Sequence, residues 1–394
     1  MKHQLLLMTY CLLLASGLSA QTKSPYINKV YEYRPAPGQF INELPEYEPG
    51  DNAREMALKA EESIENEEKI LVSLGGYGGY VIFGFDHVVV NVPGEYDFKI
   101  LANAFYANAN PNPDAPNEGG SCEPGIVMVS YDANNNGRPD DAWYELAGSE
   151  YYKPETIHNY QITYYKPDKN KVPTPNNEYR YLNDTTYVKW IDNQGNKGYV
   201  SRNTFHSQSY WPEWITADSL VFEGTKLADN YIDESGNGSY YVQYAYGWGY
   251  VDNHPNADDR SNFNIEWAVD NNGKPVNLPG VHFIKVYTGV NQYCGWLGET
   301  STEIMGAEDL HVNASTGIND LALHSGITLL NNPVEDQLIL TSVCNQELSI
   351  YNLKGTGVIT FPVSEGTNYI PCAQLPSGIY AISTKEKAIK FIKK

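Results

Sequence analysis

The sequence predicts a mainly β protein, with an antiparallel β-sandwich or jelly-roll main domain, one N-terminal helix and a small C-terminal β-sandwich. Short apolar runs rich in β-branched and aromatic residues, such as residues 81–85 and 126–131, are typical of strands. Turns of Asp, Asn and Gly separate the later runs, for example at 192–195 and 270–273. Because short strands joined by such turns pair with their neighbours, we expect antiparallel sheets.

The first 20 residues predict a secretory signal peptide. Lys2 and His3 form a basic start, an apolar run covers residues 5–14, and residues 18–20 provide a small-residue cleavage site. No Cys directly follows this site, so we do not expect a lipid-anchored amino terminus. No other apolar run approaches the length of a membrane-spanning helix, so we expect no membrane span and a soluble mature chain.

Residues 21–50 are rich in Pro, Tyr and Asn without periodicity, and we expect an extended lead-in. A single helix should follow, because Asn52 can cap it and Glu55 completes a capping box. Apolar residues at helical spacing define one face of this helix: Met56, Ala60 and Ile64.

Charge and cysteine content restrict the possible partners. A formal net charge of −21 argues against nucleic acid and against anionic membrane surfaces, and it favours cation binding. Of the 5 cysteines, Cys11 lies in the predicted signal peptide, and export permits disulfides among the rest. The pairing Cys122–Cys294 with Cys344–Cys372 suits two domains that fold separately. Four free thiols are the alternative.

A loop between the apolar runs 126–131 and 142–146 carries oxygen donors at every second position, in the pattern D-x-N-x-N-G-x-x-D. Alternate side chains can converge on a hard cation such as Ca²⁺, and Gly137 permits the sharp turn that follows. Trp143 stands where an EF-hand has its bidentate carboxylate, and the shorter spacing resembles the calcium loops of thrombospondin type 3 repeats. The predicted calcium ligands are Asp132, Asn134, Asn136, the Arg138 carbonyl, Asp140 and Asp141. The alternative is a polar hairpin loop.

Aromatic residues gather in three segments of the main domain, 205–214, 244–254 and 293–296. Rings beside Asn, Asp and His on loops can stack on a sugar or another flat ligand with polar edges. The alternative is that many of these rings belong to the core. The residues predicted to bind a ligand are Trp211, Trp214, Trp248, His206, Tyr250 and Trp296.

The sequence assigns no catalytic residue. Two carboxylates can form a glycosidase pair, and several acids are candidates: Glu123, Glu299, Glu303, Glu308 and Asp309. Paired acids also arise by chance in so acidic a chain. The sequence has no G-x-S-x-G, no H-E-x-x-H and no nucleophilic Cys with a fixed His partner. The scattered histidines favour hydrogen-bonded structural roles: His87, His206, His254 and His282.

Residues 326–394 contain ITLLNNPVEDQLIL, ELSIYNLKGTGV and LPSGIYAISTKEKAIKFIKK in this order. The Asn-Pro after the first strand, the I-Y-N-x-x-G and the terminal L-P-x-G-I-Y with its basic end resemble the type A sorting domain of the Bacteroidetes type IX secretion system. The resemblance implies a small β-sandwich recognised by the secretion machinery at the outer membrane. An accessory sandwich is the alternative. Residues 311–325 then form a linker.

The main domain, residues 51–310, contains SLGGYGGYVIFGFDHVVVNVPGEYDFKI, EPGIVMVSYDANNNGRPDDAWYELAGSEY and WLGETSTEIMGAEDL. These segments resemble Bacteroidetes secreted proteins described as "cell surface protein", some of which are encoded beside outer-membrane nutrient receptors. The resemblance therefore implies a nutrient receptor as a possible partner.

The predicted function is that of a secreted or cell-surface ligand-binding protein, stabilised by calcium, that binds a glycan or another scavenged nutrient. Two alternatives stay open. One is a hydrolase that acts on an extracellular polysaccharide, and the other is a structural surface-layer protein. A concave aromatic cleft would favour binding, whereas two facing carboxylates about 5 to 10 Å apart in a cleft would favour hydrolysis.

Overall fold

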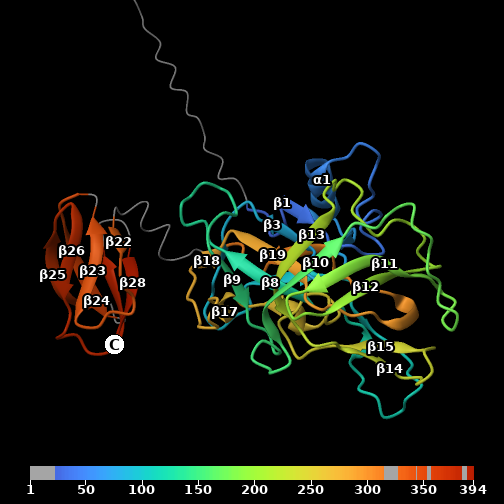
Figure 1. Cartoon of the computed structure of the whole chain (residues 1–394). Coiled ribbons are helices and arrows are strands. Elements are labelled where there is room, and N and C mark those ends of the chain that lie inside the picture. Colours follow the sequence, from blue (N-terminus) through green and yellow to red (C-terminus); the bar gives the residue numbers. More distant parts are fainter. Residues whose placement is uncertain (1–22, 315–326, 343, 353–355, 384–387) are drawn as a thin grey trace, which may run out of the picture.

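The computed structural model describes residues 23–314, 327–342, 344–352, 356–383 and 388–394 (Figure 1). The chain is mainly β, with antiparallel sheets and one α-helix among the described residues, which confirms the predicted fold class. The jelly-roll form is not confirmed, because the largest sheet has six strands in the order β1-β3-β19-β8-β9-β17. The predicted signal peptide and most of the predicted linker lie outside the described residues.

The six-stranded central sheet organises the main body. Its strands are β1 (Lys29–Arg34), β3 (Tyr80–Gly84), β19 (Phe283–Thr288), β8 (Gly125–Ser130), β9 (Trp143–Leu146) and β17 (Ala268–Val269). Both faces of this sheet are covered, so its strands carry long apolar runs. On β8, Val127 and Val129 enter one hydrophobic core, whereas Ile126 enters the other. This alternation follows from the two-residue period of a strand.

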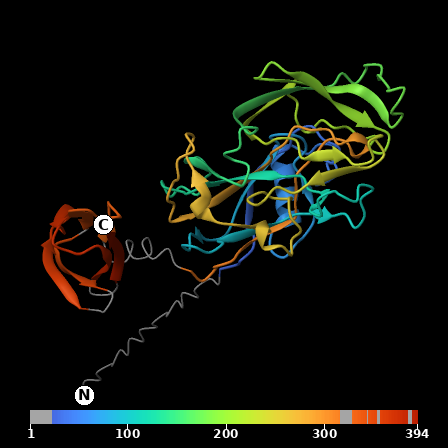
Figure 2. The same ribbon diagram turned by 90° about the horizontal axis from the view of Figure 1, so that it is seen from below.

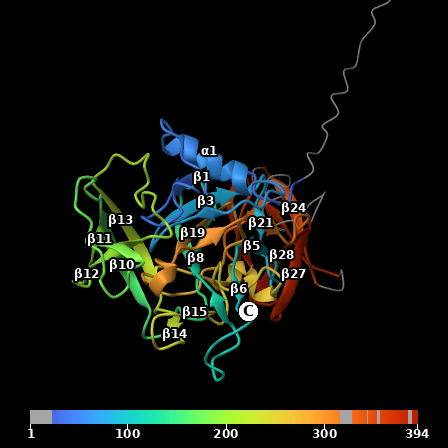
Figure 3. The ribbon, with the colours of Figure 1, turned by 90° about the vertical axis from the view of Figure 1, so that its right-hand side faces the viewer.

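Helix α1 (Ala53–Ile64) and a three-stranded sheet cover the first face (Figure 3). The three strands are β16 (Asn262–Phe263), β5 (Phe98–Leu101) and β21 (Gly306–Asp309). The predicted capping box is confirmed: Asn52 accepts from the amides of Arg54 and Glu55, and the Glu55 carboxylate accepts from the Asn52 amide. The predicted apolar helix face is buried in this core.

A four-stranded sheet covers the second face and stands as a separate layer in Figure 2, where it is green. Its strands, in spatial order, are β12 (Lys197–Asn203), β11 (Leu182–Asp192), β10 (Ile157–Tyr165) and β13 (Ser219–Lys226). Between this sheet and the central one lies a second core that is rich in tyrosine. Tyr160 and Tyr164 of β10 are buried there together with Tyr287 of β19. Tyrosine rings, each with one polar hydroxyl, therefore fill much of the space between the sheets.

Shorter elements complete the main body. They are β2 (Val72–Ser73), β4 (Val89–Val90), β6 (Phe105–Tyr106), β7 (Gly119–Ser121), β14 (Tyr231–Asp233), β15 (Tyr241–Tyr244), β18 (Gly280–Val281) and β20 (Glu303–Ile304), with 3-10 turns at Asp259–Ser261, Ile265–Trp267 and Gly295–Leu297. Within the described ranges, no helix is long and apolar enough to cross a membrane. Four cysteines are free thiols: Cys122, Cys294, Cys344 and Cys372.

The C-terminal segment forms two antiparallel sheets around a core of its own, as predicted. One sheet has β22 (Ile327–Leu329), β23 (Gln337–Ser342) and β26 (Gly366–Pro371). The other has β25 (Gly357–Val363), β24 (Gln346–Asn352), β27 (Gly378–Ser383) and β28 (Ala388–Lys393). Leu340 and Ile350, one from each sheet, are fully buried in this core.

Candidate functional site

A cleft of about 410 Å³ opens where the central sheet meets the four-stranded sheet. We call it the inter-sheet cleft. Trp143 and Glu145 of β9 contribute to one wall, and His158 of β10 and Thr225 of β13 contribute to the opposite wall. The two strands of the β8–β9 hairpin pair through Ser130 opposite Trp143. The register of this hairpin thus sets which side chains of β9 face the cleft.

A hydrogen bond across the floor of the cleft joins Glu145 to the four-stranded sheet. Thr225 Oγ1 lies 2.6 Å from Glu145 Oε2 and 3.2 Å from His158 Nδ1. His158 Nε2 lies 3.1 Å from the carbonyl oxygen of Tyr151. Burial raises the pKa of Glu145 to about 7, and the bond from Thr225 only partly offsets this rise.

The contacts of His158 and Thr225 form a chain of polar groups that ends at Glu145. The Tyr151 carbonyl can only accept, so His158 Nε2 donates to it. Thr225 Oγ1 donates to Glu145 Oε2 and lies within hydrogen-bond distance of His158 Nδ1. The Thr225 hydroxyl therefore links the acid to the imidazole.

The rest of the cleft combines aromatic rings with polar groups. Tyr151 lines the cleft beside Trp143, and Lys285 of β19 enters from the central sheet. Burial lowers the pKa of Lys285. Its Nζ lies 4.1 Å from the centre of the Tyr80 ring and 5.8 Å from that of Tyr287. Such a mixture of rings, amides and charges is suited to bind a polar ligand.

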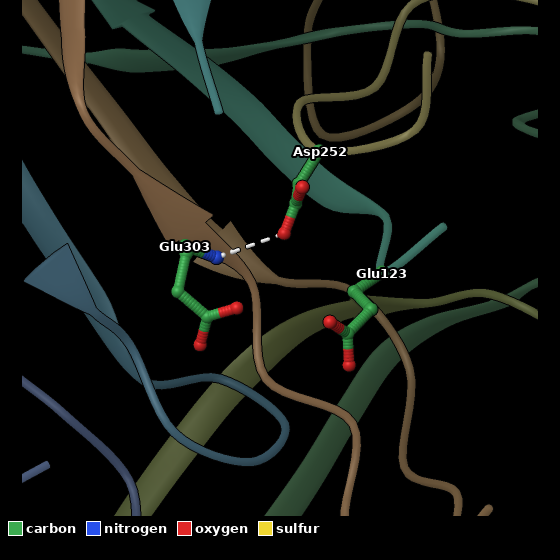
Figure 4. Close-up of side chains that lie close together, drawn as sticks. All are labelled: Glu123, Asp252 and Glu303. Atoms are coloured by element: carbon green, nitrogen blue, oxygen red, sulfur yellow. Dashed lines mark hydrogen bonds between the residues drawn. The ribbon is translucent and has the colours of Figure 1, made fainter. Parts of the chain in front are cut away.

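Three carboxylates meet at a second place in the main body: Glu123, Asp252 and Glu303 (Figure 4). We call them the carboxylate trio. One oxygen from each lies within 4.8 Å of the others. The backbone holds them together, because the Glu123 amide donates to the Asp252 carbonyl at 2.7 Å, and the Glu303 amide donates to Asp252 Oδ2 at 3.0 Å. The side chain of Asp252 is only 3% exposed.

Neighbouring hydroxyls complete the surroundings of the trio. Ser121 Oγ donates to Glu123 Oε2 at 3.1 Å, and Ser73 Oγ donates to Glu303 Oε1 at 3.0 Å. Burial raises the pKa of Glu123 to about 7 and that of Glu303 to about 8, and the charge of Glu123 adds to the second rise. Burial also raises the pKa of Asp252 well above its usual value. This arrangement can share protons or hold a cation.

The predicted calcium loop joins the paired strands β8 and β9, as expected. Its side chains fold inward on one another. The Asp132 carboxylate accepts from the amides of Asn136 and Gly137 at 3.1 and 2.8 Å. The side-chain amides of Asn134 and Asn136 donate to Asp140 at 3.2 and 3.1 Å, and these bonds lower the pKa of Asp140. Asp141 lies beside this group with its Oδ2 buried and without a hydrogen-bond partner among the described residues.

Of the predicted aromatic ligand residues, three lie in the hydrophobic cores. Trp211, Trp214 and Tyr250 are 2%, 9% and 2% exposed. Trp211 and Tyr250 pack in the tyrosine-rich core, and Trp214 stacks on Tyr33 in the other core. Burial leaves these three rings little surface to offer a ligand, although Trp211 also lines a surface pocket with Tyr187 and Arg202. Their role in ligand binding stays a prediction.

The other three predicted residues are not brought together. Trp248 is exposed and lies against Trp267 at 4.6 Å between ring centres. Trp296 is exposed near Phe205, and the half-buried His206 contacts Phe40. None of the six predicted residues lines the inter-sheet cleft. The sequence pattern alone therefore did not identify the aromatic residues of this cleft.

The sequence did not indicate that four residues line one cleft together: Trp143, Glu145, His158 and Thr225. One indication was available: Glu145 is an acid within the apolar run 142–146, where a charged side chain on a central strand needs a special reason. The contact with Thr225 was not accessible, because it depends on how two sheets pack. Of the trio, sequence reasoning named Glu123 and Glu303 but missed Asp252.

The C-terminal segment has a known counterpart. Residues 331–394 match the family model described as "Secretion system C-terminal sorting domain". Among curated proteins, none matches the chain. The family match agrees with the two-sheet fold of this segment and implies interaction with the secretion machinery. The chain therefore carries a type IX sorting domain and is exported to the cell surface or the extracellular space.

Proposed function

We propose that the main domain is an extracellular binding module that holds a glycan or a similarly polar nutrient in the inter-sheet cleft. The observation that carries this proposal is the lining of the cleft, where Trp143 and Tyr151 lie beside several amide and acidic side chains. Rings can stack on the apolar face of a sugar, and amides can hydrogen-bond its hydroxyls. A volume of about 410 Å³ lies within the usual range for small-molecule sites.

The location of the protein supports the same proposal. The type IX sorting domain directs the chain to the outside of the cell, where glycans and other nutrients are captured. The main-domain motifs that resemble Bacteroidetes cell-surface proteins favour this role as well. An outer-membrane nutrient receptor is then the natural partner, because a captured ligand must pass through the outer membrane.

Calcium binding by the 132–141 loop is a second part of the proposal. The support is the convergence of four oxygen-bearing side chains on one small volume and the buried, unpartnered Oδ2 of Asp141. Carboxylate and amide oxygens are the ligands that Ca²⁺ prefers. A bound ion would replace the side-chain hydrogen bonds to Asp140 and hold the β8–β9 hairpin closed.

The experiment that tests glycan binding is a titration of the full chain with a panel of soluble oligosaccharides, monitored by calorimetry with calcium and with chelator. Trp143→Ala should weaken binding of any hit at least tenfold. Trp296→Ala is the control, since its ring is exposed but lies outside the cleft. Equal loss in both variants, or no saturable binding of any oligosaccharide, would refute the proposal.

A hydrolase that acts on extracellular polysaccharide is the second candidate. One observation favours it: burial raises the pKa of Glu145 to about 7, and Glu145 lines the cleft with a hydrogen bond from Thr225. A carboxyl group that is protonated near neutrality can serve as a general acid. Release of reducing ends from a polysaccharide by the wild-type chain, and its loss in Glu145→Gln, would favour this candidate over a binding module.

A further inference from the structure

A second, smaller cavity borders the four-stranded sheet and shares no lining residue with the inter-sheet cleft. Its volume is about 120 Å³. Five of the residues that line it are aromatic: Tyr77, Tyr164, Trp190, Tyr199 and Tyr293. Tyr77 and Tyr164 are buried at the inner end, whereas Tyr199 on β12 is 45% exposed and marks the side that faces solvent.

One carboxylate, that of Glu299, also lines this cavity. Glu299 is 8% exposed, and its Oε1 accepts from the Gln39 amide at 2.6 Å. Its Oε2 is buried and has no hydrogen-bond partner among the described residues. The hydroxyls of Tyr77 and Tyr293, which line the same cavity, are likewise buried without partners in this part of the chain. Three polar groups that need a partner therefore border one small space.

The chemistry of the wall restricts what can bind. The residues that line the cavity include no Lys, Arg or His to attract an anion. Burial raises the pKa of Glu299 well above its usual value, and a cation bound beside this carboxylate would favour its ionised form. A hard metal ion requires six to eight oxygen ligands, whereas Glu299 is the only carboxylate among the residues that line this cavity and five of them are aromatic. Aromatic faces attract organic cations, and a carboxylate supplies the counter-charge.

We propose that this cavity binds a small organic ammonium ion, with Glu299 as its counter-ion and the rings of Tyr164, Trp190 and Tyr293 around its alkyl groups. A cavity of about 150 Å³ accommodates benzene, so 120 Å³ is suited to a headgroup of about five heavy atoms, such as a trimethylammonium group with the methylene that carries it. The ligand enters past the exposed Tyr199.

The test is a calorimetric titration of the full chain with choline, which carries a trimethylammonium group. The control ligand is 3,3-dimethylbutan-1-ol, in which a carbon atom replaces the charged nitrogen at almost the same size. We expect saturable binding of choline and at least tenfold weaker binding of the alcohol. Equal affinity for the two compounds would show an apolar pocket without a preference for charge, and no binding of choline would also overturn the proposal.

Two variants locate the site. Glu299→Gln keeps an oxygen for the Gln39 amide but removes the charge, and choline binding should fall at least tenfold. Tyr199→Ala changes a half-exposed ring at the entrance and should weaken choline binding several-fold, and it keeps the proposal testable if Glu299→Gln disturbs folding. Glu62→Gln, on the exposed surface of α1, should bind choline as the wild type does. Full choline affinity in Tyr199→Ala and Glu299→Gln would refute the assignment.

Discussion

The Thr225 hydroxyl on β13 and the Glu145 carboxylate on β9 lie 2.6 Å apart and join two different β-sheets. Glu145 would otherwise be a buried acid without a donor from a side chain, because Thr225 is its only side-chain hydrogen-bond partner among the described residues. A single hydroxyl therefore holds the Glu145 carboxylate in position at the junction of the sheets.

Replacement of Thr225 by valine should show how much this contact stabilises the folded state. Thr225→Val keeps the shape of the side chain but leaves Glu145 and His158 without their shared partner. A buried polar group that loses its hydrogen bond costs about 1–3 kcal/mol, so the free energy of unfolding in urea should fall by that amount. Thr216→Val, at an exposed position, should change it by less than about 0.5 kcal/mol. Equal effects of both changes would contradict the prediction.

Calcium should raise the melting temperature if the 132–141 loop binds it. Binding to the folded state alone stabilises by about 2.7 kcal/mol when the free ion is a hundredfold above Kd. Scanning calorimetry should show a higher melting temperature in Ca²⁺ than in chelator, and Asp132→Ala should abolish the difference. Mg²⁺ should substitute poorly, because it demands a tighter octahedral shell.

The matched control for the calcium loop is Asp270→Ala. Asp270 accepts from the amides of Asn272 and Lys274 in a turn of similar composition that lacks the full ligand pattern. This variant should retain the calcium effect. Superimposed melting curves in calcium and in chelator for the wild type would identify the 132–141 loop as a hairpin turn.

Trp211 and Trp296 should behave in opposite ways when each is replaced by alanine. Trp211 is 2% exposed within the tyrosine-rich core, and its loss should lower the free energy of unfolding by roughly 3–5 kcal/mol. Trp296 is 39% exposed, and its loss should cost less than about 1 kcal/mol. Equilibrium denaturation measures both. A small loss for Trp211→Ala would favour its assignment to a ligand surface.

The carboxylate trio should make the main domain less stable as the pH rises from about 6.5 to 8. Burial raises the folded-state pKa of Glu123 to about 7 and of Glu303 to about 8, whereas a free Glu titrates near about 4.3. The folded state therefore binds more protons than the unfolded state in this range, and its stability falls with rising pH. Glu145, whose pKa burial raises to about 7, adds to the same fall. The lowered pKa values of His206, His254 and His282 act mainly below this window.

Urea denaturation at pH 6.5, 7 and 8 in chelator measures the slope of the free energy of unfolding against pH. Chelator is needed because a bound cation would keep the acids ionised. Glu303→Gln should reduce the slope, whereas Glu62→Gln on the helix surface should retain it. A stability that rises with pH in chelator, with Glu303 intact, would show that the trio is ionised in the folded state.

Removal of the sorting domain should separate export from folding. The C-terminal segment has its own hydrophobic core, so a chain that ends before residue 327 should keep the melting temperature of the main domain to within about 2 °C. The truncated protein should accumulate in the periplasm, as cell fractionation would show. Normal amounts at the surface or in the medium would contradict the role of the sorting domain.

Local patterns were sufficient to predict the local structure. The capping box at Asn52 and Glu55 predicted where α1 begins, because a helix start depends on residues three positions apart. The turn composition after residue 131 predicted the β8–β9 hairpin. Trp211 and Trp214 stand among prolines rather than in an alternating run, and that irregular sequence concealed their burial.

Long-range contacts were not predictable in the same way. Asp252 reaches Glu123 and Glu303 only because three distant segments meet beside the start of β8. Glu145 meets Thr225 because one sheet packs on another at a particular offset. No periodicity in a single sequence specifies such an offset, so the inter-sheet cleft and the trio became visible only in three dimensions.

The 132–141 loop and the inter-sheet cleft are next to each other in the sequence, because strand β9 begins directly after the loop and lines the cleft. Asp141 closes the 132–141 loop, and Trp143 and Glu145 of β9 follow it directly into the inter-sheet cleft. If an ion at the loop changes the affinity of the cleft for its ligand, thermodynamic reciprocity requires the ligand to change the affinity for the ion by the same factor. If the ion stabilises the hairpin in the form that binds the ligand, removal of calcium would favour release of the ligand from the cleft.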